Sequence, residues 1–199
     1  LDASTLGKID IQGTDASELL NRVYTNAWSK LEIGKCRYGL MLNEDGMVYD
    51  DGVTTRLNEN HYIMTTTTGG AANVMSKLED YLQTEWPELE VYLTSVTDHF
   101  ATISICGPNS KKILNKIVPE LDLSDENFPH MSFKNAKIGK INCRIMRISF
   151  TGEHSYEINI QANYGNSVWE KCMEAGKEYN ITPYGTEAMH LLRAEKGFI

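Results

Sequence analysis

The sequence of 199 residues lacks the features of membrane and nucleic-acid-binding proteins. It has no run of roughly 20 apolar residues, which excludes a membrane-spanning helix, and no recognisable signal peptide. Its 19 Lys and Arg residues are scattered among 27 Asp and Glu residues, so no basic surface for nucleic acid is expected. We therefore expect a globular, acidic protein with neither a nucleic-acid partner nor a membrane partner.

Cysteine is scarce and widely spaced. The four cysteines are Cys36, Cys106, Cys143 and Cys172, and they form no CxxC pair. This spacing favours neither a zinc site nor a disulfide framework, and it is typical of a reducing, cytoplasmic compartment. The five histidines have no HxxxH or HxH spacing. We predict buried structural thiols and no metal site.

Motifs for phosphate binding and for serine hydrolases are also missing. Gly69 and Gly70 follow a threonine run, but no GxGxxG pattern and no Walker lysine accompany them. No serine lies in a GxSxG motif. We interpret the two glycines as part of a turn from a strand to a helix.

Two segments of the sequence repeat each other at a constant offset. Residues 8–23 align with residues 102–117, so that Gly13 corresponds to Gly107. Each copy has an alternating strand, a glycine turn and a helix. In the first copy, Asp15 and Glu18 resemble a capping box.

The segments that follow each repeat also match in outline, because each half continues with a hairpin, a strand and a second helix. This β-α-β-β-α-β-like order predicts an α+β fold of two pseudo-repeated, ferredoxin-like halves with antiparallel sheets. The halves cover about residues 1–95 and 96–199 of one domain, and the polar segment 94–98 connects them. A cleft between such halves is a common place for a ligand. The start at Leu1 indicates a fragment of a longer chain.

The most informative segment is a predicted β-hairpin that contains two adjacent aspartates. Residues 38–42 and 47–55 are strand-like, and Gly46 suits the positive φ of a turn. Strand alternation sends Asp50 and Asp51 to opposite faces, so one can face water while the other needs a partner or a ligand. Alternatively, the strand ends there and both carboxylates are solvated.

A second carboxylate, Glu157, has a similar place in the other half, on a strand after a hairpin-like segment. It is either an outward-facing strand residue or an acceptor for two N–H groups of a flat heterocycle. Tyr38 is equally suited to stack on such a ring or to belong to the core. Near the end of the chain, a helix from about Thr186 has Met189 on a side that would face the core.

Taken together, these segments are similar to the tetrahydrofolate-binding family of the glycine-cleavage T-protein, the aminomethyltransferases. The similarity spans nearly the whole sequence. Its motifs are Asp2-Ala3-Ser4 with Leu6-Gly7, Leu42 to Asp51, Cys106-Gly107-Pro108, residues 150–157 and Leu192-Arg193-Ala194-Glu195. Residues 183–197 most resemble the sarcosine oxidase α-subunit branch of this family, where the domain belongs to a longer chain.

The resemblance implies a tetrahydrofolate site. Asp51 matches the family's catalytic aspartate beside the reactive folate nitrogens, and Glu157 matches the glutamate that holds the pterin. The remaining implied contacts are Leu6, Tyr38, Thr66, Phe150 and Met189. At the last two positions the aminomethyltransferases have tyrosine and arginine, so the departures favour the oxidase branch.

For that branch, the resemblance implies that oxidised sarcosine arrives as an iminium and that tetrahydrofolate captures its carbon as 5,10-methylenetetrahydrofolate, releasing glycine. Other sarcosine oxidase subunits would be partners, with FAD, FMN and NAD bound elsewhere in the complex. The alternatives are a folate-dependent aminomethyltransferase or demethylase, and a non-catalytic interaction module.

Overall fold

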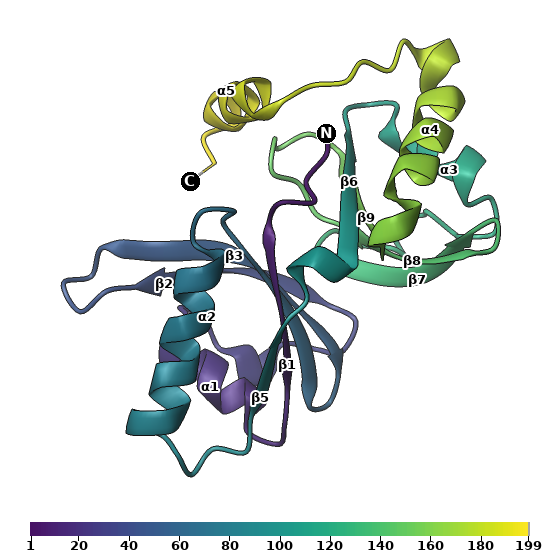
Figure 1. Cartoon of the computed structure of the whole chain (residues 1–199). Coiled ribbons are helices and arrows are strands. Elements are labelled where there is room, and N and C mark those ends of the chain that lie inside the picture. Colours follow the sequence, from purple (N-terminus) through teal and green to yellow (C-terminus); the bar gives the residue numbers. More distant parts are fainter. Residues whose placement is uncertain (199) are drawn as a thin grey trace. The chain divides into compact units, whose positions relative to one another are not determined.

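The computed structural model describes residues 1–198, which form two compact units. The N-unit is Thr5–Thr97, and the C-unit combines the chain from Asp98 onward with Leu1–Ser4. Each unit has its own antiparallel sheet and its own hydrophobic core (Figure 1). The sequence repeat does not indicate that the first four residues belong with the second half.

The N-unit has the element order β-α-β-β-β-α-β. Its strands are β1 (Gly7–Gln12), β2 (Cys36–Leu42), β3 (Val48–Asn58), β4 (His61–Thr66) and β5 (Tyr92–Ser95). Its helices are α1 (Ala16–Val23), the 3₁₀ turn η1 (Trp28–Lys30), α2 (Ala71–Asp80) and the π-helical turn η2 (Tyr81–Glu85). The sheet order β2-β3-β4-β1-β5 is the ferredoxin-like order with β2 added at one edge.

Helices α1 and α2 cover one face of this sheet (Figure 1). Alternate positions on the strands and one stripe of each helix are apolar, so their side chains meet in a single core. The core includes Ile9, Ile11, Tyr62 and Met64 from the strands, and Ala16, Leu20, Val74 and Leu78 from the helices.

The C-unit repeats this arrangement. Its strands are β6 (Phe100–Cys106), β7 (Ser132–Ile138), β8 (Ile141–Arg147) and β9 (Ser155–Gln161), in the sheet order β6-β9-β8-β7. Its helices are α3 (Ser110–Ile117), α4 (Gly165–Gly176) and α5 (Thr186–Lys196), with 3₁₀ turns η4 (Ala162–Tyr164) and η5 (Lys177–Tyr179). A further 3₁₀ turn, η3 (Thr97–His99), precedes β6. The predicted α+β fold of two pseudo-repeated halves is confirmed, and the predicted hairpin and following strand are the three strands between the helices of each half.

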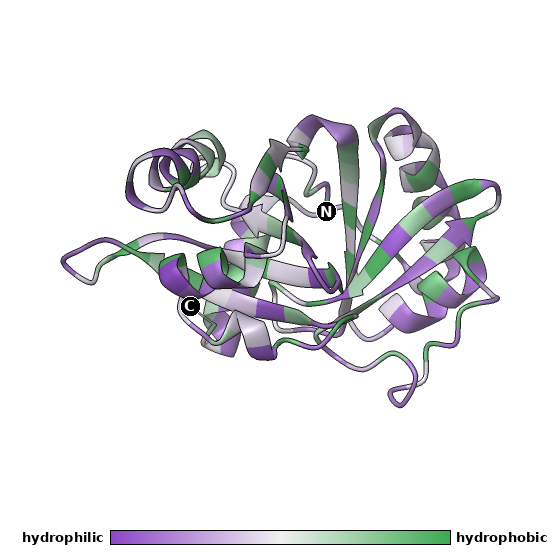
Figure 2. Ribbon diagram, turned by 90° about the horizontal axis from the view of Figure 1, so that it is seen from below, coloured by the Kyte–Doolittle hydropathy of each residue, from purple (hydrophilic) through white to green (hydrophobic). Residues whose placement is uncertain are grey.

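Hydrophobic and hydrophilic residues alternate along the strands of the C-unit (Figure 2). Ile103, Ile105 and Ile158 face the core formed with α3 and α4. Their sequence neighbours therefore lie on the other face, where the Thr102 hydroxyl donates to Oδ1 of Asn159 (2.8 Å). This second face of the sheet is consequently polar.

Residues 1–4 occupy the place in the C-unit sheet that β5 has in the N-unit sheet, beside the first strand. Asp2 forms an antiparallel bridge with Ile103. The Ala3 amide donates to the Thr102 carbonyl (2.8 Å), and the Ser104 amide donates to the Leu1 carbonyl (2.9 Å). The second ferredoxin-like half is therefore completed by residues from the opposite end of the sequence.

Two local predictions are wrong. Asp15 and Glu18 form no capping box, because the Asp15 carboxylate accepts the Glu90 amide (2.9 Å) and Glu18 pairs with Arg22 (2.8 Å). Residues 94 and 95, expected in a connection, are the end of β5 and pair with β1. In both places a partner remote in sequence outweighs the local pattern.

The four cysteines are free thiols, and Cys106 is only partly buried while the other three are buried. Burial raises the pKa of the Cys143 thiol to about 11 and that of the Cys172 thiol to about 12, so both stay protonated near neutral pH. Among residues 1–198, no helix is long and apolar enough to span a membrane.

Candidate functional site

The predicted hairpin is present and holds the two aspartates in the middle of a strand. Gly46 has a φ of 81°, and the Asn43 amide donates to the Met47 carbonyl (2.8 Å) across the turn. A β-bulge follows, since Met41 pairs with Asp50 while Leu42 pairs with Val48. Strand β3 continues to Asn58, so the alternative in which the strand ends at the aspartates is wrong.

Asp51 and Tyr38 are brought together by this hairpin. The Tyr38 hydroxyl donates to Oδ2 of Asp51 at 2.8 Å, and both side chains are half-buried. Asp51 pairs with Leu40 and Tyr38 pairs with Val53, so the two side chains are diagonal neighbours on one face of the sheet. Tyr38 therefore orients the carboxylate that the family resemblance selects.

Asp50 has different surroundings, as strand alternation predicts. It is buried, with 3% of its surface exposed, and its Oδ1 accepts the Thr67 hydroxyl (2.6 Å) and the Thr67 amide (3.3 Å). Burial raises the pKa of the Asp50 carboxyl above its ordinary value. Of the two aspartates, Asp50 is thus enclosed by the protein while Asp51 keeps an accessible carboxylate.

Tyr24 is a further polar group at this site that the sequence does not reveal. It lies directly after α1, forms a bridge with Met41 of β2, and is buried. Burial and the negative charges of Asp50 and Asp51 raise the pKa of Tyr24. Its hydroxyl has no hydrogen-bond partner within residues 1–198. The bridge to β2 is a tertiary contact, so no local motif marks this tyrosine.

Leu6 and Thr66 lie at one end of the same sheet. Thr66 is buried opposite Gly7, and its hydroxyl donates to the Thr67 carbonyl (3.0 Å). Leu6 is half-buried just before β1, and its carbonyl accepts Nζ of Lys8 (2.9 Å). The neighbouring threonine, Thr67, is the one that donates to Asp50.

Glu157 lies on β9, opposite Ser104 of β6 and Met146 of β8. Only 7% of its surface is exposed, so the interpretation as an outward-facing, solvated strand residue is wrong. Its neighbours Tyr156 and Ile158 belong to the core, which places Glu157 on the polar face of the sheet. A buried carboxylate on a polar sheet face is suited to bind hydrogen-bond donors.

The two carboxylates do not occupy equivalent places in the two halves, contrary to the prediction. Asp51 is on β3, whose counterpart in the C-unit is β8, whereas Glu157 is on β9, the counterpart of β4. Because Ser104 corresponds to Asp10 in the repeat, the N-unit equivalent of Glu157 is Ile63. The halves have therefore diverged in their functional residues while keeping their topology.

Tyr184 adds a hydroxyl to the surroundings of Glu157. It accepts a hydrogen bond from Sγ of Cys106 (3.1 Å). Burial, followed by the contact with Cys106 and the charge of Glu157, raises the pKa of Tyr184. A cavity of about 330 Å³ is lined in part by Ser104, Cys106 and Tyr184.

Phe150 and α5 lie together in the C-unit. The Phe150 ring meets His190 edge-on at 6.0 Å between centroids, and the guanidinium of Arg193 lies 5.5 Å from the Phe150 ring centroid. Helix α5 has no buried residue, so the core position predicted for Met189 is wrong and its side chain is half-buried. Lys196 at the end of this helix forms an ion pair with Glu153 in the loop between β8 and β9 (2.8 Å).

Residues 1–199 match the family model described as the GCVT N-terminal domain. The chain belongs to this family. A sarcosine oxidase subunit alpha from Corynebacterium sp. (strain P-1) is 57% identical over the whole chain, which covers 21% of that protein. The relative of the same name from Rhizobium meliloti (strain 1021) is 52% identical. The GCVT domain thus spans about a fifth of the length of these relatives.

Aminomethyltransferases are more distant relatives of this GCVT domain. The enzyme from Thermoanaerobacter sp. (strain X514) is 34% identical over 98% of the chain and 52% of its own length. In fold, the chain resembles the glycine cleavage system aminomethyltransferase T from Bartonella henselae, with a TM-score of 0.83, 24% identity and coverage of 100% of this chain and 50% of that one. The predicted family and fold are confirmed.

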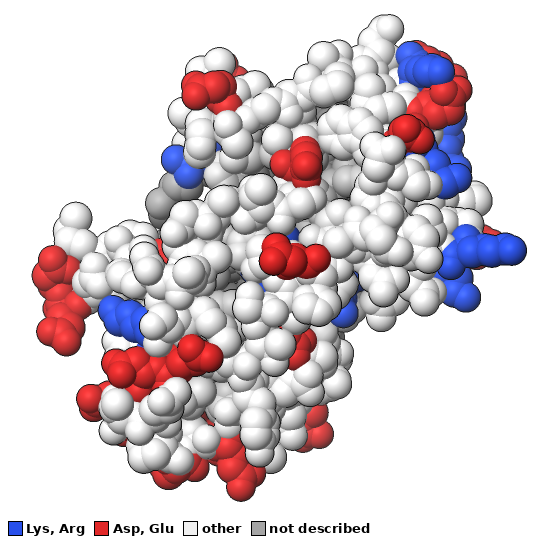
Figure 3. Space-filling view, viewed as in Figure 1, with Lys and Arg blue, Asp and Glu red and all other residues white. Residues whose placement is uncertain are grey.

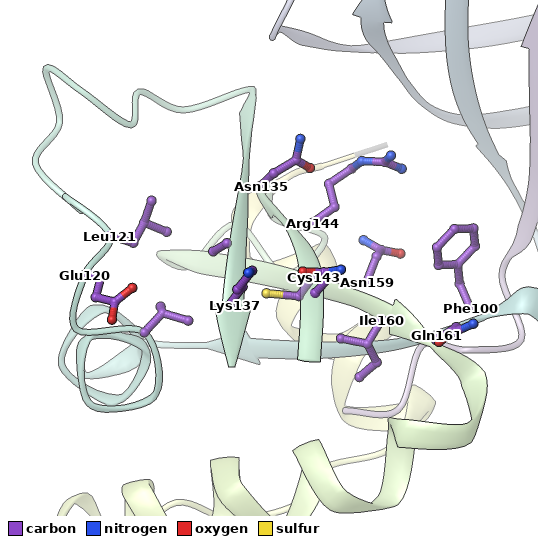
Figure 4. Close-up of a pocket in the computed structure, with 13 residues that line it drawn as sticks. Phe100, Glu120, Leu121, Asn135, Lys137, Cys143, Arg144, Asn159, Ile160 and Gln161 are labelled. Atoms are coloured by element: carbon purple, nitrogen blue, oxygen red, sulfur yellow. The ribbon is translucent and has the colours of Figure 1, made fainter. Parts of the chain in front are cut away.

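A larger cavity of about 550 Å³ lies elsewhere in the C-unit of this GCVT domain (Figure 4). Its lining includes Asn135, Lys137, Arg144 and Asn159, from strands β7, β8 and β9. None of the predicted site residues lines it. Within the described part of the chain, no cluster of three or more His, Cys, Asp or Glu side chains could hold a metal ion.

Proposed function

We propose that this GCVT domain binds tetrahydrofolate and carries the one-carbon transfer of a sarcosine oxidase α subunit. The main support is the Asp51 carboxylate, which is half-buried and oriented by Tyr38 in a chain whose most similar relatives reported above are sarcosine oxidase α subunits. In this proposal, other sarcosine oxidase subunits are partners in the cytoplasm, and FAD, FMN and NAD bind outside this domain.

The reaction can be written with balanced atoms. A folate nitrogen attacks the CH₂=N⁺ carbon of the sarcosine-derived iminium, and a C–N bond forms. The second folate nitrogen then attacks the same carbon and displaces glycine. The two protons lost from the folate nitrogens are both gained by the departing amino group, so no further reactant is needed.

Asp51 has the properties that this sequence of steps requires. A carboxylate near the folate nitrogens stabilises the cationic iminium, accepts the proton of the attacking nitrogen and returns it to the leaving amine. Tyr38 holds Oδ2, and a carboxylate has acceptor capacity for more than one hydrogen bond. We therefore assign Asp51 as the catalytic residue.

Glu157 is the proposed pterin ligand. Two neighbouring N–H groups on the edge of a pterin match the spacing of carboxylate oxygens, and burial strengthens such charge-assisted hydrogen bonds. Leu6, Tyr38, Thr66, Phe150 and Met189 are proposed as the other folate contacts. Phe150 has a ring without a hydroxyl, and Met189 has a side chain without charge. The aminomethyltransferases have tyrosine and arginine at these positions, so these two proposed contacts differ from theirs.

The test is Asp51→Asn in the complete oxidase. We expect methylenetetrahydrofolate formation to slow by about 10²- to 10⁴-fold, the usual contribution of a general acid–base group, while the Kd for tetrahydrofolate changes little. Sarcosine oxidation would continue, and the uncaptured iminium would hydrolyse to formaldehyde, which can be measured. Asp45→Asn in the exposed hairpin turn is the matched control. Unchanged methylene transfer in Asp51→Asn would contradict the proposal.

A further inference from the structure

Asp50 is held by a turn that is distant in sequence. Its Oδ1 accepts the hydroxyl of Thr67 (2.6 Å) and the amide of Thr67 (3.3 Å). The same hydroxyl oxygen of Thr67 accepts the amide of Gly70 (3.0 Å), the residue before α2. Asp50, Thr67 and Gly70, called here the Asp50 cluster, thus join β3 to the start of α2.

The packing around this cluster leaves no room for a side chain at position 70. A Cβ atom added to Gly70 would lie 2.4 Å from Oδ1 of Asp50 and 2.7 Å from Oγ1 of Thr67. A Cβ atom added to Gly69 would meet nothing within 4 Å. Gly70 has an ordinary φ of −85°, so the close approach of Asp50, not backbone conformation, requires glycine there.

The Asp50 cluster is a costly arrangement for the fold alone. Asp50 is 3% exposed, and its Oδ2 has no hydrogen-bond partner in the described residues. A buried carboxylate with an unsatisfied oxygen destabilises a protein, and an apolar residue of similar volume would often be more stable there. Such a group is retained more readily when it determines a local geometry.

The Asp50 cluster determines the position of the neighbouring residue, Asp51. The two residues share a peptide bond, so the hydrogen bonds from Thr67 hold the backbone from which the Asp51 side chain projects. Tyr38 holds the Asp51 carboxylate itself (2.8 Å). Asp51 is therefore constrained through Thr67, which follows β4, and through Tyr38 on β2.

We infer that Asp50, through Thr67 and Gly70, is a positioning residue that keeps the Asp51 carboxylate at the reacting atoms. This inference rests on the proposed function of Asp51. Asp50 itself touches neither folate nor the iminium in this assignment. A misplacement of about 1 Å at a reacting group can cost on the order of 100-fold in rate, so loss of the cluster has a measurable consequence.

The test uses Thr67→Val and Thr67→Ser in the complete oxidase. Thr67 is exposed, so neither change disturbs the core. Valine removes the hydroxyl at nearly constant shape, and we expect methylenetetrahydrofolate formation to fall about 10- to 100-fold, with more of the carbon released as formaldehyde. The Kd for tetrahydrofolate should stay unchanged, while the Tm should fall, because the buried Asp50 carboxylate loses one of its two hydrogen bonds from Thr67. Serine restores the hydroxyl and should restore transfer.

Gly70→Ala and Gly69→Ala form a second, matched pair. The methyl group of Gly70→Ala displaces Asp50, so it should lower transfer as Thr67→Val does, whereas Gly69→Ala should behave as the unmodified enzyme. If Gly70→Ala does not fold, the comparison of Thr67→Val with Thr67→Ser alone tests the inference.

Three outcomes would overturn the inference: normal transfer in Thr67→Val, a loss of transfer that serine does not restore, or a loss of transfer that accompanies an equal loss of folate affinity. Asp51→Asn, measured in parallel, separates this result from the proposed function. If Asp51→Asn abolishes transfer while Thr67→Val does not lower it, only the role of Asp50 fails. If Asp51→Asn transfers normally, the proposed function fails and the inference fails with it.

Discussion

Adjacent carboxylates in one strand have distinct chemical surroundings in this protein. Asp50 accepts two hydrogen bonds from Thr67 in a buried position, while Asp51 accepts one from the Tyr38 hydroxyl and stays half-buried. The period of two along a strand produces this separation without any loop or bulge between the two residues. One side chain can therefore support the backbone while its neighbour remains available to a ligand.

At the scale of single residues, we predict that a substitution of Glu157 weakens tetrahydrofolate binding. Glu157→Gln keeps the shape of the side chain but removes its charge and one of its acceptors. Charge-assisted hydrogen bonds contribute about 1.5–3 kcal/mol, so we expect the Kd for tetrahydrofolate to rise roughly 10- to 100-fold. Transfer at saturating folate should be retained, because Glu157 is not assigned a proton-transfer role.

Isothermal titration calorimetry of the complete oxidase measures this change. Glu170→Gln on the exposed surface of α4 is the control for the general effect of losing one negative charge. An unaltered Kd in Glu157→Gln would remove this residue from the pterin site.

At the scale of elements, both halves have kept a strand–turn–helix unit with a glycine in the turn. Gly13 and Gly107 both have positive φ, at 136° and 104°, and each joins a strand to a helix. Their surroundings differ. A Cβ atom added to Gly13 would lie 1.9 Å from the Glu90 carbonyl oxygen, whereas one added to Gly107 would meet nothing within 4 Å.

This difference predicts unequal costs for the same substitution. Gly107→Ala should cost about 1–3 kcal/mol from backbone strain, and Gly13→Ala should cost more because strain and a clash with the chain backbone combine. Free energies of unfolding from denaturant titrations, compared between the two variants, measure the difference. Equal costs, or a larger cost at Gly107, would show that the Glu90 contact is unimportant.

The negative charge of the whole molecule is concentrated in the N-unit. The chain has a net charge of −8, and Thr5–Thr97 contains twice as many acidic as basic residues, while the C-unit is nearly balanced. Figure 3 shows Asp and Glu side chains gathered over the N-unit. This acidic surface attracts the CH₂=N⁺ group of the proposed iminium but not the molecule as a whole, because its carboxylate makes it neutral overall.

Residues 1–4 pair with the edge of β6 through a β-bridge at Asp2, which leads to a prediction for the molecule as a whole. Ala3→Pro removes the amide that donates to the Thr102 carbonyl, and we expect a loss of about 1–3 kcal/mol. The amides of Thr102 and Ser104, which donate to Ser4 and Leu1, should then exchange faster with solvent. Hydrogen exchange followed at these two amides provides the measurement.

Ala3→Gly keeps the amide and is the control. Equal exchange rates in the two variants would show that residues 1–4 do not stabilise the β6 edge.

The sequence by itself determined the features that depend on neighbouring residues. The repeat of residues 8–23 and 102–117 predicted the duplicated topology, and the turn chemistry at Gly46 predicted the hairpin. Alternation predicted that Asp50 and Asp51 face opposite sides. Backbone dihedrals and side-chain periodicity are local properties, so a single sequence is sufficient for them.

Only the tertiary structure decided which of these side chains is buried and what it contacts. Asp50 is enclosed because Thr67, 17 positions away, donates to it. Glu157 is buried on a strand that is not the counterpart of the Asp51 strand, Met189 lies outside the core, and residues 1–4 complete a sheet formed by the other end of the chain. Burial depends on which remote segment packs over a residue, and the free energy of that packing outweighs local propensity.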